Sequence, residues 1–318
     1  MAYASTIFNQ LLNFLPKDRF DHFVGQHEAD RYVKKLTTWN QLTALLYAQA
    51  TGKESLREIE TGMSSHQNTW SHLGIESVAR STLSDANARR PHSIFEQLFY
   101  ALLDRCHSVT PKNKFSFTNP LYTFDATTIR LCLSVFDWAK YTRRKGALKL
   151  HTLLGNNTDI PELVTITDGK TGDVTAAKMA ELTKRLERGS IVVFDRAYID
   201  YAWWYQMHKA GLFFVSRIKK NTNIQLLGQH ATVTERDVVA DLFVLIGEYG
   251  GLATYPEKIR LVKVRDAKSG EIYSYLTNNL ILSASQIAEV YKGLSPNSPL
   301  SPPLFHNQIT AWHVRIKA

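Results

Sequence analysis

Cysteine is scarce in this sequence, and long apolar runs are absent from it. Its 318 residues include two cysteines, Cys106 and Cys132, which have no metal-ligand spacing, so we expect reduced thiols rather than a cysteine metal site. No apolar run approaches the roughly 18 residues that a membrane-spanning helix needs. The first 20 residues lack a basic segment and a continuous apolar segment, so no secretory signal is expected. These absences predict a cytoplasmic protein that does not span a membrane.

Basic residues are in excess over acidic ones. The chain carries 38 Lys and Arg against 29 Asp and Glu, a formal net charge of +9 at pH 7. A surplus of positive charge favours a polyanionic partner, either nucleic acid or an anionic membrane surface. A hydrophobic content of 44% allows a sizeable core, and the length allows two domains or one large one.

Residues 1–112 have the apolar spacing of helices. Apolar residues recur every three or four positions before Pro16, and "TTWNQLTALLYAQATG" carries a threonine cap, an apolar stripe and a terminal Gly52. Within this region, "STLSDANARRP" offers hydroxyls and the arginines Arg89 and Arg90, with Arg80 just before it. Such a helix could reach phosphates and base edges in a DNA groove. It could equally be a capped surface helix with arginines at its negative end.

From about residue 118 the pattern changes to strands that alternate with helices. Three strand-like segments precede a helix, and a strand, a helix and a strand follow. This order predicts an α/β layer with a mixed sheet.

Two of the predicted strands end in an aspartate that follows a phenylalanine. These are Asp125 in "LYTFD" and Asp195 in "SIVVFD". A single aspartate at a strand end is often a turn former or a helix cap. If the two strands are neighbours, however, the carboxylates converge and repel each other unless a cation lies between them. Hard oxygen ligands of this kind suit Mg²⁺.

A basic segment lies between two of the strands. Residues 138–151 contain no acid, and their aromatic residues are interleaved with Lys140, Arg143, Arg144 and Lys149, before His151. Cations there can hold a phosphate backbone and aromatic rings can stack on bases. A solvated loop is the alternative interpretation.

Four segments together resemble the bacterial insertion-sequence DDE transposases of the IS-four type: "YTFDATTI", "KLHTLL", "TDGKTGDVTAAK" and "VVFDRAYIDY". The resemblance extends from residue 1 to about residue 292. It implies an α/β fold, with an RNase H-like mixed-sheet core over 113–292, a β-rich insertion at 219–280, and an all-helical DNA-binding domain over 1–112.

The resemblance also implies site residues and partners. Asp125 and Asp195 would be catalytic and would hold Mg²⁺ or Mn²⁺. From the positions of the basic residues we expect the DNA contacts to come from Arg80, Arg89, Arg90, Lys140, Arg143, Arg144, Lys149, His151 and Arg196. The partners would be double-stranded DNA, as terminal inverted repeats and target DNA, and a second copy in a homo-oligomer, with no membrane partner. The protein would lie in the cytoplasm, associated with the nucleoid.

The C-terminal end departs from the family pattern. The family's third carboxylate lies on a helix with the pattern Tyr, two residues, Arg, three residues, Glu, six residues, Lys. Tyr291 matches the tyrosine, but Leu294, Ser298 and Phe305 occupy the other three positions. Four prolines lie between 296 and 303, where they disfavour a helix, and no acid follows Glu289.

This departure predicts a truncated or frame-shifted copy with an aberrant Pro-rich tail at 293–318 and little or no catalytic activity. Two other functions stay open. The chain could bind element ends without chemistry, as an inhibitor of transposition, or it could be an RNase H-like nuclease.

Overall fold

The computed structural model describes residues 7–65, 78–109, 117–131, 140–142, 145–158, 160–219, 222–232, 235–247, 254–267 and 269–292. Contacts divide the chain into two compact units, one built on residues 7–109 and the other on the sheet that follows. No described helix is long and apolar enough to cross a lipid bilayer. The tail expected at 293–318 lies outside the described residues.

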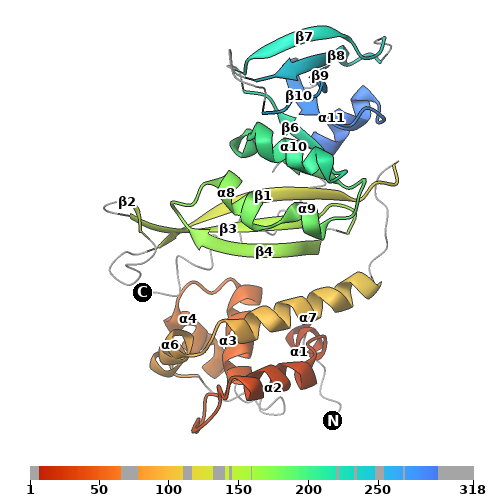
Figure 1. Ribbon diagram of the computed structural model, residues 1–318. Coiled ribbons are helices and arrows are strands. Elements are labelled where there is room, and N and C mark those ends of the chain that lie inside the picture. Colours follow the sequence, from red (N-terminus) through yellow and green to blue (C-terminus); the bar gives the residue numbers. More distant parts are fainter. Residues whose placement is uncertain are drawn as a thin grey trace. The chain divides into compact units, whose positions relative to one another are not determined.

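The described residues of the N-terminal unit form helices and no strand (Figure 1). The helices are α1 (Ile7–Asn13), α2 (Lys17–Gln26), α3 (Thr38–Thr51), α4 (Leu56–Ser65), α6 (Arg80–Arg89) and α7 (Ser93–Val109).

Helix α3 has the ends that its sequence predicts. The Thr37 side chain accepts a hydrogen bond from the Asn40 amide, and Gly52 ends the helix with a left-handed φ of 64°. Its buried residues pack against α1, α4 and α6, while α2 and α7 share a second core with it.

The second unit is built on one mixed sheet. Its strands are β1 (Leu121–Leu131), β2 (Lys140–Thr142), β3 (Lys145–Gly155), β4 (Ile160–Asp168), β5 (Ile191–Phe194), β6 (Phe213–Arg217), β7 (Ile224–Gln229), β8 (Val238–Ile246), β9 (Ile259–Arg265) and β10 (Ile272–Thr277). Their order is β2-β3-β1-β5-β6-β10-β9-β8-β7, and β4 also pairs with β3. The mixed sheet expected from the sequence is confirmed, since β1, β5 and β6 are parallel and the β6–β10 pair is antiparallel.

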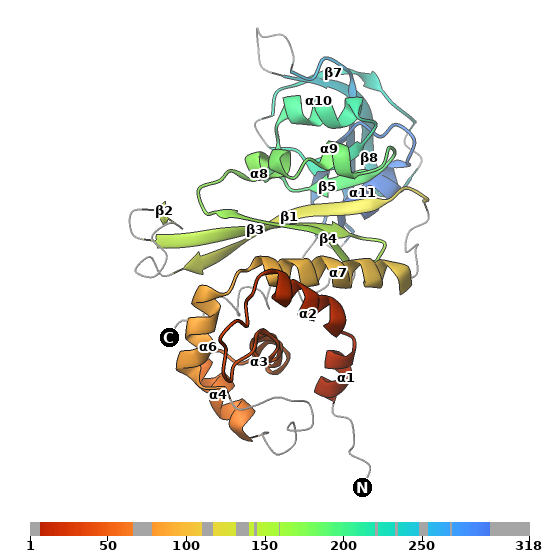
Figure 2. The ribbon, with the colours of Figure 1, turned by 60° about the horizontal axis from the view of Figure 1, so that its bottom comes forward.

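Helices cover both faces of the central strands, so these strands are buried on both sides. Figure 2 shows α8 (Asp173–Met179), α9 (Leu182–Arg185) and α10 (Tyr201–Lys209) on one face. Their apolar residues form a core with Phe124, Phe194 and Phe214. The other face is covered by α11 (Ala284–Lys292), which packs on Val193 and Val215.

Residues 219–280, expected to be rich in β-structure, contain β7 to β10. These strands continue the same sheet, because β10 pairs with β6 along Thr277↔Val215 and Tyr275↔Arg217. The chain then leaves β10 and enters α11, so this segment lies directly before the helix that covers Val193 and Val215.

Candidate functional site

Asp125 and Asp195 lie side by side on neighbouring parallel strands. The register of β1 and β5 ends in the pair Phe124↔Phe194, so each aspartate is one residue beyond a matched pair. Asp195 is still extended, with φ −71° and ψ 163°, so the alternation of side chains continues through it. The two aspartates therefore lie at the same level on neighbouring strands, whose backbones are about 4.8 Å apart. Their side chains point to the face of the sheet opposite Phe124 and Phe194.

Local hydrogen bonds orient the two carboxylates in the same way. Asp125 Oδ1 accepts from the Ala126 amide at 2.8 Å, and Asp195 Oδ1 accepts from the Arg196 amide at 2.6 Å. Asp195 thereby caps the short 3-10 helix η2 (Arg196–Tyr198). Both residues are exposed, although the strand that leads to Asp195 is fully buried. The buried strand β5 is therefore followed directly by a carboxylate that is exposed to solvent.

Arg217, at the end of the next strand β6, adds a positive charge beside the two aspartates. Asp125, Asp195 and Arg217 thus form a row of charges across the ends of β1, β5 and β6. In the register of β5 and β6, Phe194 pairs with Ser216, so Arg217 follows at the level of Asp195. Its guanidinium carbon lies 4.5 Å from the centre of the Tyr273 ring. Arg217 forms no ion pair within the part of the chain that the structure describes, so its charge is available beside Asp195. Sequence reasoning missed this residue, although it has the same signal as the aspartates, a charge at the end of a buried strand.

Two tyrosines lie next to Arg217, on the side away from the aspartates. Tyr275 pairs with Arg217 across β10 and β6, and its ring centre lies 5.0 Å from that of Tyr291 on α11. Burial, and then the charge of Asp195, raise the pKa of Tyr291, while Arg217 and Arg196 oppose this shift. The C-terminal end of α11 therefore lies against Tyr275, whose partner in the strand register is Arg217.

A buried hydroxyl lies on the other side of the aspartates. The Tyr198 hydroxyl has no hydrogen-bond partner among the described residues, and the side chain is buried against Phe124. Burial raises the pKa of Tyr198, and the negative charges of Asp125, Asp173 and Asp195 raise it further. The buried Tyr198 hydroxyl therefore remains protonated beneath the ends of β1 and β5.

The arginines of α6 divide into two kinds. Arg80 and Arg89 are exposed, as a DNA contact requires. Arg90 is different, since its side chain is 8% exposed and its Nη2 lies 3.2 Å from Asp30 Oδ1. Its Nη1 also donates to Gln41 Oε1 at 2.9 Å, and burial lowers its pKa while Asp30 opposes that shift. Arg90 therefore ties the end of α6 to the loop before α3, and this burial argues against the DNA contact expected of it.

The residues expected to bind DNA on β3 face the protein interior. Lys149 Nζ donates to Asp173 Oδ1 and to the Thr171 carbonyl, both at 2.9 Å. His151 is 0% exposed, and its Nε2 lies 2.9 Å from Thr167 Oγ1. Burial lowers the pKa of His151, which favours the neutral ring. His151 is therefore a core residue, and neither side chain is presented to a phosphate, which argues against the DNA contacts expected of both.

The other expected DNA contacts are described less fully. Arg196 is exposed and directly follows Asp195. Lys140 lies on β2, and Arg143 and Arg144 lie outside the described residues.

The two aspartates fit a hard divalent cation as two of its ligands. Both are exposed carboxylates at one level of the sheet, and Mg²⁺ is usually held by one or two carboxylates with substrate phosphates and waters. Over the described residues, no three His, Cys, Asp or Glu side chains gather around one point in a way that could hold a metal ion.

Comparison with known proteins gives matches in both parts of the chain. Residues 117–293 match the family described as "Transposase DDE domain", and residues 3–76 match "Domain of unknown function (DUF4372)". The Sinorhizobium fredii protein "Putative transposase y4zB" is 32% identical over 218 residues. That alignment covers 66% of this chain and 58% of the relative, so the chain spans less than two thirds of the relative's length.

Two solved structures show weaker likeness. The cryo-EM structure of the piggyBac transposase synaptic complex with hairpin DNA matches with a TM-score of 0.46 and 11% identity, over 98% of this chain and 74% of that one. The crystal structure of the NurA nuclease from Sulfolobus solfataricus matches with a TM-score of 0.25 and 8% identity, over 63% and 80%. Because the match to residues 117–293 covers more than half of the 318 residues, the chain belongs to the Transposase DDE domain family.

Proposed function

We propose that this chain is a transposase of a bacterial insertion sequence of the IS-four type, with Asp125 and Asp195 as its two remaining catalytic carboxylates. The observation that carries the proposal is their equal level on the adjacent parallel strands β1 and β5. The strand order β4-β3-β1-β5-β6 with helices on both faces supports an RNase H-like core. The partners in this proposal are the double-stranded ends of the element and its target DNA.

In this proposal, the two aspartates bind the metal ion and the neighbouring arginines bind phosphate. Asp125 and Asp195 would hold Mg²⁺ or Mn²⁺, and a divalent ion held there would stabilise the charge on the attacking and leaving oxygens of a phosphodiester. The cation of Arg217 lies next in the row, and Arg196 is exposed beside it, so both can neutralise a phosphate oxygen. Tyr291 borders this end from α11.

A second candidate function is DNA binding without catalysis, for example as an inhibitor that occupies element ends. It is favoured because no third acidic ligand joins the two aspartates in the described part of the chain. It is also favoured because Arg80 and Arg89 remain exposed on α6 for DNA contacts that require no metal.

Metal binding tests the proposed role of the two aspartates. We expect the purified chain to bind Mn²⁺ in titrations followed by electron paramagnetic resonance. Because each carboxylate supplies a ligand, Asp125→Asn or Asp195→Asn should weaken binding by about tenfold or more. Asp18→Asn, an exposed aspartate on α2, is the matched control and should leave the affinity unchanged. Equal affinities in all four proteins would exclude a metal site at these strand ends.

DNA binding tests the proposed role of Arg217. We expect Arg217→Gln to weaken the binding of duplex DNA in the presence of EDTA and to reduce the salt slope by about one, because one phosphate contact is lost. Arg236→Gln removes an exposed arginine from the connection between β7 and β8 and serves as the control. An unchanged slope in Arg217→Gln, measured by fluorescence anisotropy at several salt concentrations, would remove Arg217 from the DNA site.

A further inference from the structure

We infer that Asp241 and Arg260 are positioning residues, which act on the site at Asp125 and Asp195 by fixing the loop before α11. The inference rests on the proposed function only in treating those two aspartates as a site.

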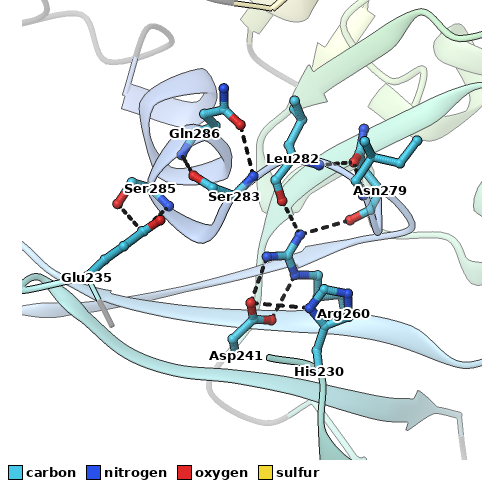
Figure 3. Close-up of polar contacts among 10 residues, drawn as sticks. His230, Glu235, Asp241, Arg260, Asn279, Leu282, Ser283, Ser285 and Gln286 are labelled. Atoms are coloured by element: carbon cyan, nitrogen blue, oxygen red, sulfur yellow. Dashed lines mark hydrogen bonds and ion pairs between the residues drawn. The ribbon is translucent and has the colours of Figure 1, made fainter. Parts of the chain in front are cut away.

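The two side chains form a buried ion pair between β8 and β9. Arg260 Nε donates to Asp241 Oδ1 at 2.8 Å, and its Nη2 donates to Asp241 Oδ2 at 2.7 Å. The residues are 1% and 4% exposed. His230 adds a third group, with its Nδ1 3.4 Å from Asp241 Oδ2 (Figure 3). The carboxylate and two nitrogens of the guanidinium are thus fully engaged with each other.

The remaining nitrogen of Arg260 is directed to the loop between β10 and α11. Its Nη1 donates to the carbonyl of Asn279 at 3.2 Å and to the carbonyl of Leu282 at 2.6 Å. The Asn279 Oδ1 accepts from the amides of Ile281 and Leu282, at 2.9 Å each. The loop is therefore tied at both ends to one buried cation, as Figure 3 shows.

A second carboxylate from the same β-rich segment holds the first turn of α11. Ser283 and Gln286 cap the helix reciprocally, through Ser283 Oγ and Gln286 Oε1. Glu235 Oε2 accepts from the Ser285 amide at 2.9 Å and from the Ser285 hydroxyl. A negative charge at a helix N-terminus is favourable because the amides there are unpaired. Two residues from the β-rich segment thus hold the start of α11: Arg260 binds the Leu282 carbonyl, and Glu235 binds Ser285.

The far end of the same helix lies at the site. Ile287, Ala288 and Val290 pack on the sheet, and the ring centre of Tyr291 in the last turn lies 5.0 Å from that of Tyr275. Tyr275 pairs with Arg217, which lies at the level of Asp195. Because a helix of nine residues moves as a unit, the loop that fixes its start also fixes the position of Tyr291. An apolar pair would often stabilise the interior as well as a buried ion pair. It could not donate to two loop carbonyls, and this is the specific contribution of Arg260.

The test uses the double variant Asp241→Leu/Arg260→Met, which removes both buried charges together so that neither is left unpaired. We expect amide hydrogen exchange in residues 284–292 to become about tenfold faster, because two buried carbonyls lose their donor. Exchange in β5 and β6 should not change. Arg265→Met, at the exposed end of the same strand, is the matched control and should exchange like the wild type.

A spectroscopic measurement reports on the site itself. In protein labelled with 3-fluorotyrosine, the Tyr291 resonance is assigned by its loss in Tyr291→Phe. We expect Asp195→Asn to shift this resonance in the wild-type background, because the charge of Asp195 acts on Tyr291. The shift should be much smaller in the double variant, since Tyr291 is no longer held in that position.

Unchanged exchange in α11, or an Asp195→Asn shift of the same size in both backgrounds, would overturn the inference. If the double variant fails to fold, Arg260→Lys gives the same readouts, because lysine cannot bind Asp241 in a bidentate way and also donate to both carbonyls. All measurements are made without metal and DNA. A failure of the proposed function would appear in the Mn²⁺ titrations and would leave these results intact.

Discussion

Incubated with pre-cleaved element ends and Mg²⁺ or Mn²⁺, the purified chain should form no more joined product than its own Asp125→Ala variant. The two-metal reaction needs acidic ligands that hold both ions roughly 3.5 to 4 Å apart. The described residues bring two aspartates together for this purpose, Asp125 and Asp195. Ser298 stands where the family resemblance implies a glutamate, and a neutral hydroxyl is a poor ligand for Mg²⁺. Groups that only orient metal ligands already cost 10–100-fold when lost, so we expect a deficit of at least about 100-fold against a three-carboxylate relative.

Glu289 is the one acid of α11 that could act instead. It precedes Tyr291 by two residues, about 200° around the helix, and it is exposed whereas Val290 is buried. It should therefore point away from Asp195. Robust joining that disappears in Asp125→Ala would contradict the prediction, and Glu289→Gln would then be the next variant to measure.

Replacing Phe194 by alanine should lower the free energy of unfolding by about 3 to 5 kcal/mol. Phe194 is 0% exposed and is the last residue of β5, directly before Asp195. Its ring centre lies 5.3 Å from that of Trp203 and 5.7 Å from that of Trp204. The aromatic rings around it cannot close the cavity that alanine would leave, so most of the lost contact is not recovered.

Urea unfolding followed by near-ultraviolet circular dichroism measures this loss. Phe14→Ala is the matched control, because Phe14 is 63% exposed and its replacement should change stability by no more than about 0.5 kcal/mol. A loss below about 1 kcal/mol in Phe194→Ala would mean that the core around β5 repacks, contrary to our description of it.

The parts of the fold that could be predicted are those set by neighbours in the sequence. Thr37 and Gly52 end α3 as their residue types predict, since a cap depends on amides and carbonyls within a few positions. The strand that ends in Asp195 was likewise visible as an apolar run followed by an acid. The sequence predicts that the two carboxylates converge only if β5 is a neighbour of β1. The register Phe124↔Phe194 shows that the two strands are neighbours.

The parts that could not be predicted depend on partners far along the chain. Arg90 is buried because Asp30 lies beside it, 60 residues earlier. His151 is in the core because β4 brings Thr167 to it. Arg217 joins the site only through the register of three strands, and no local pattern contains that register.

The pairing of β6 with β10 has a consequence for the protein while it is being synthesised. Strand β6 ends at Arg217 and its antiparallel partner begins at Ile272, so the ribosome must add the 54 residues from 218 to 271 between them. At 5–20 residues per second, this takes roughly 3 to 11 seconds. During that interval, the newly made β6 exposes a row of unpaired amides and carbonyls beside apolar side chains. Such an edge is the kind of surface to which chaperones bind and at which nascent chains aggregate.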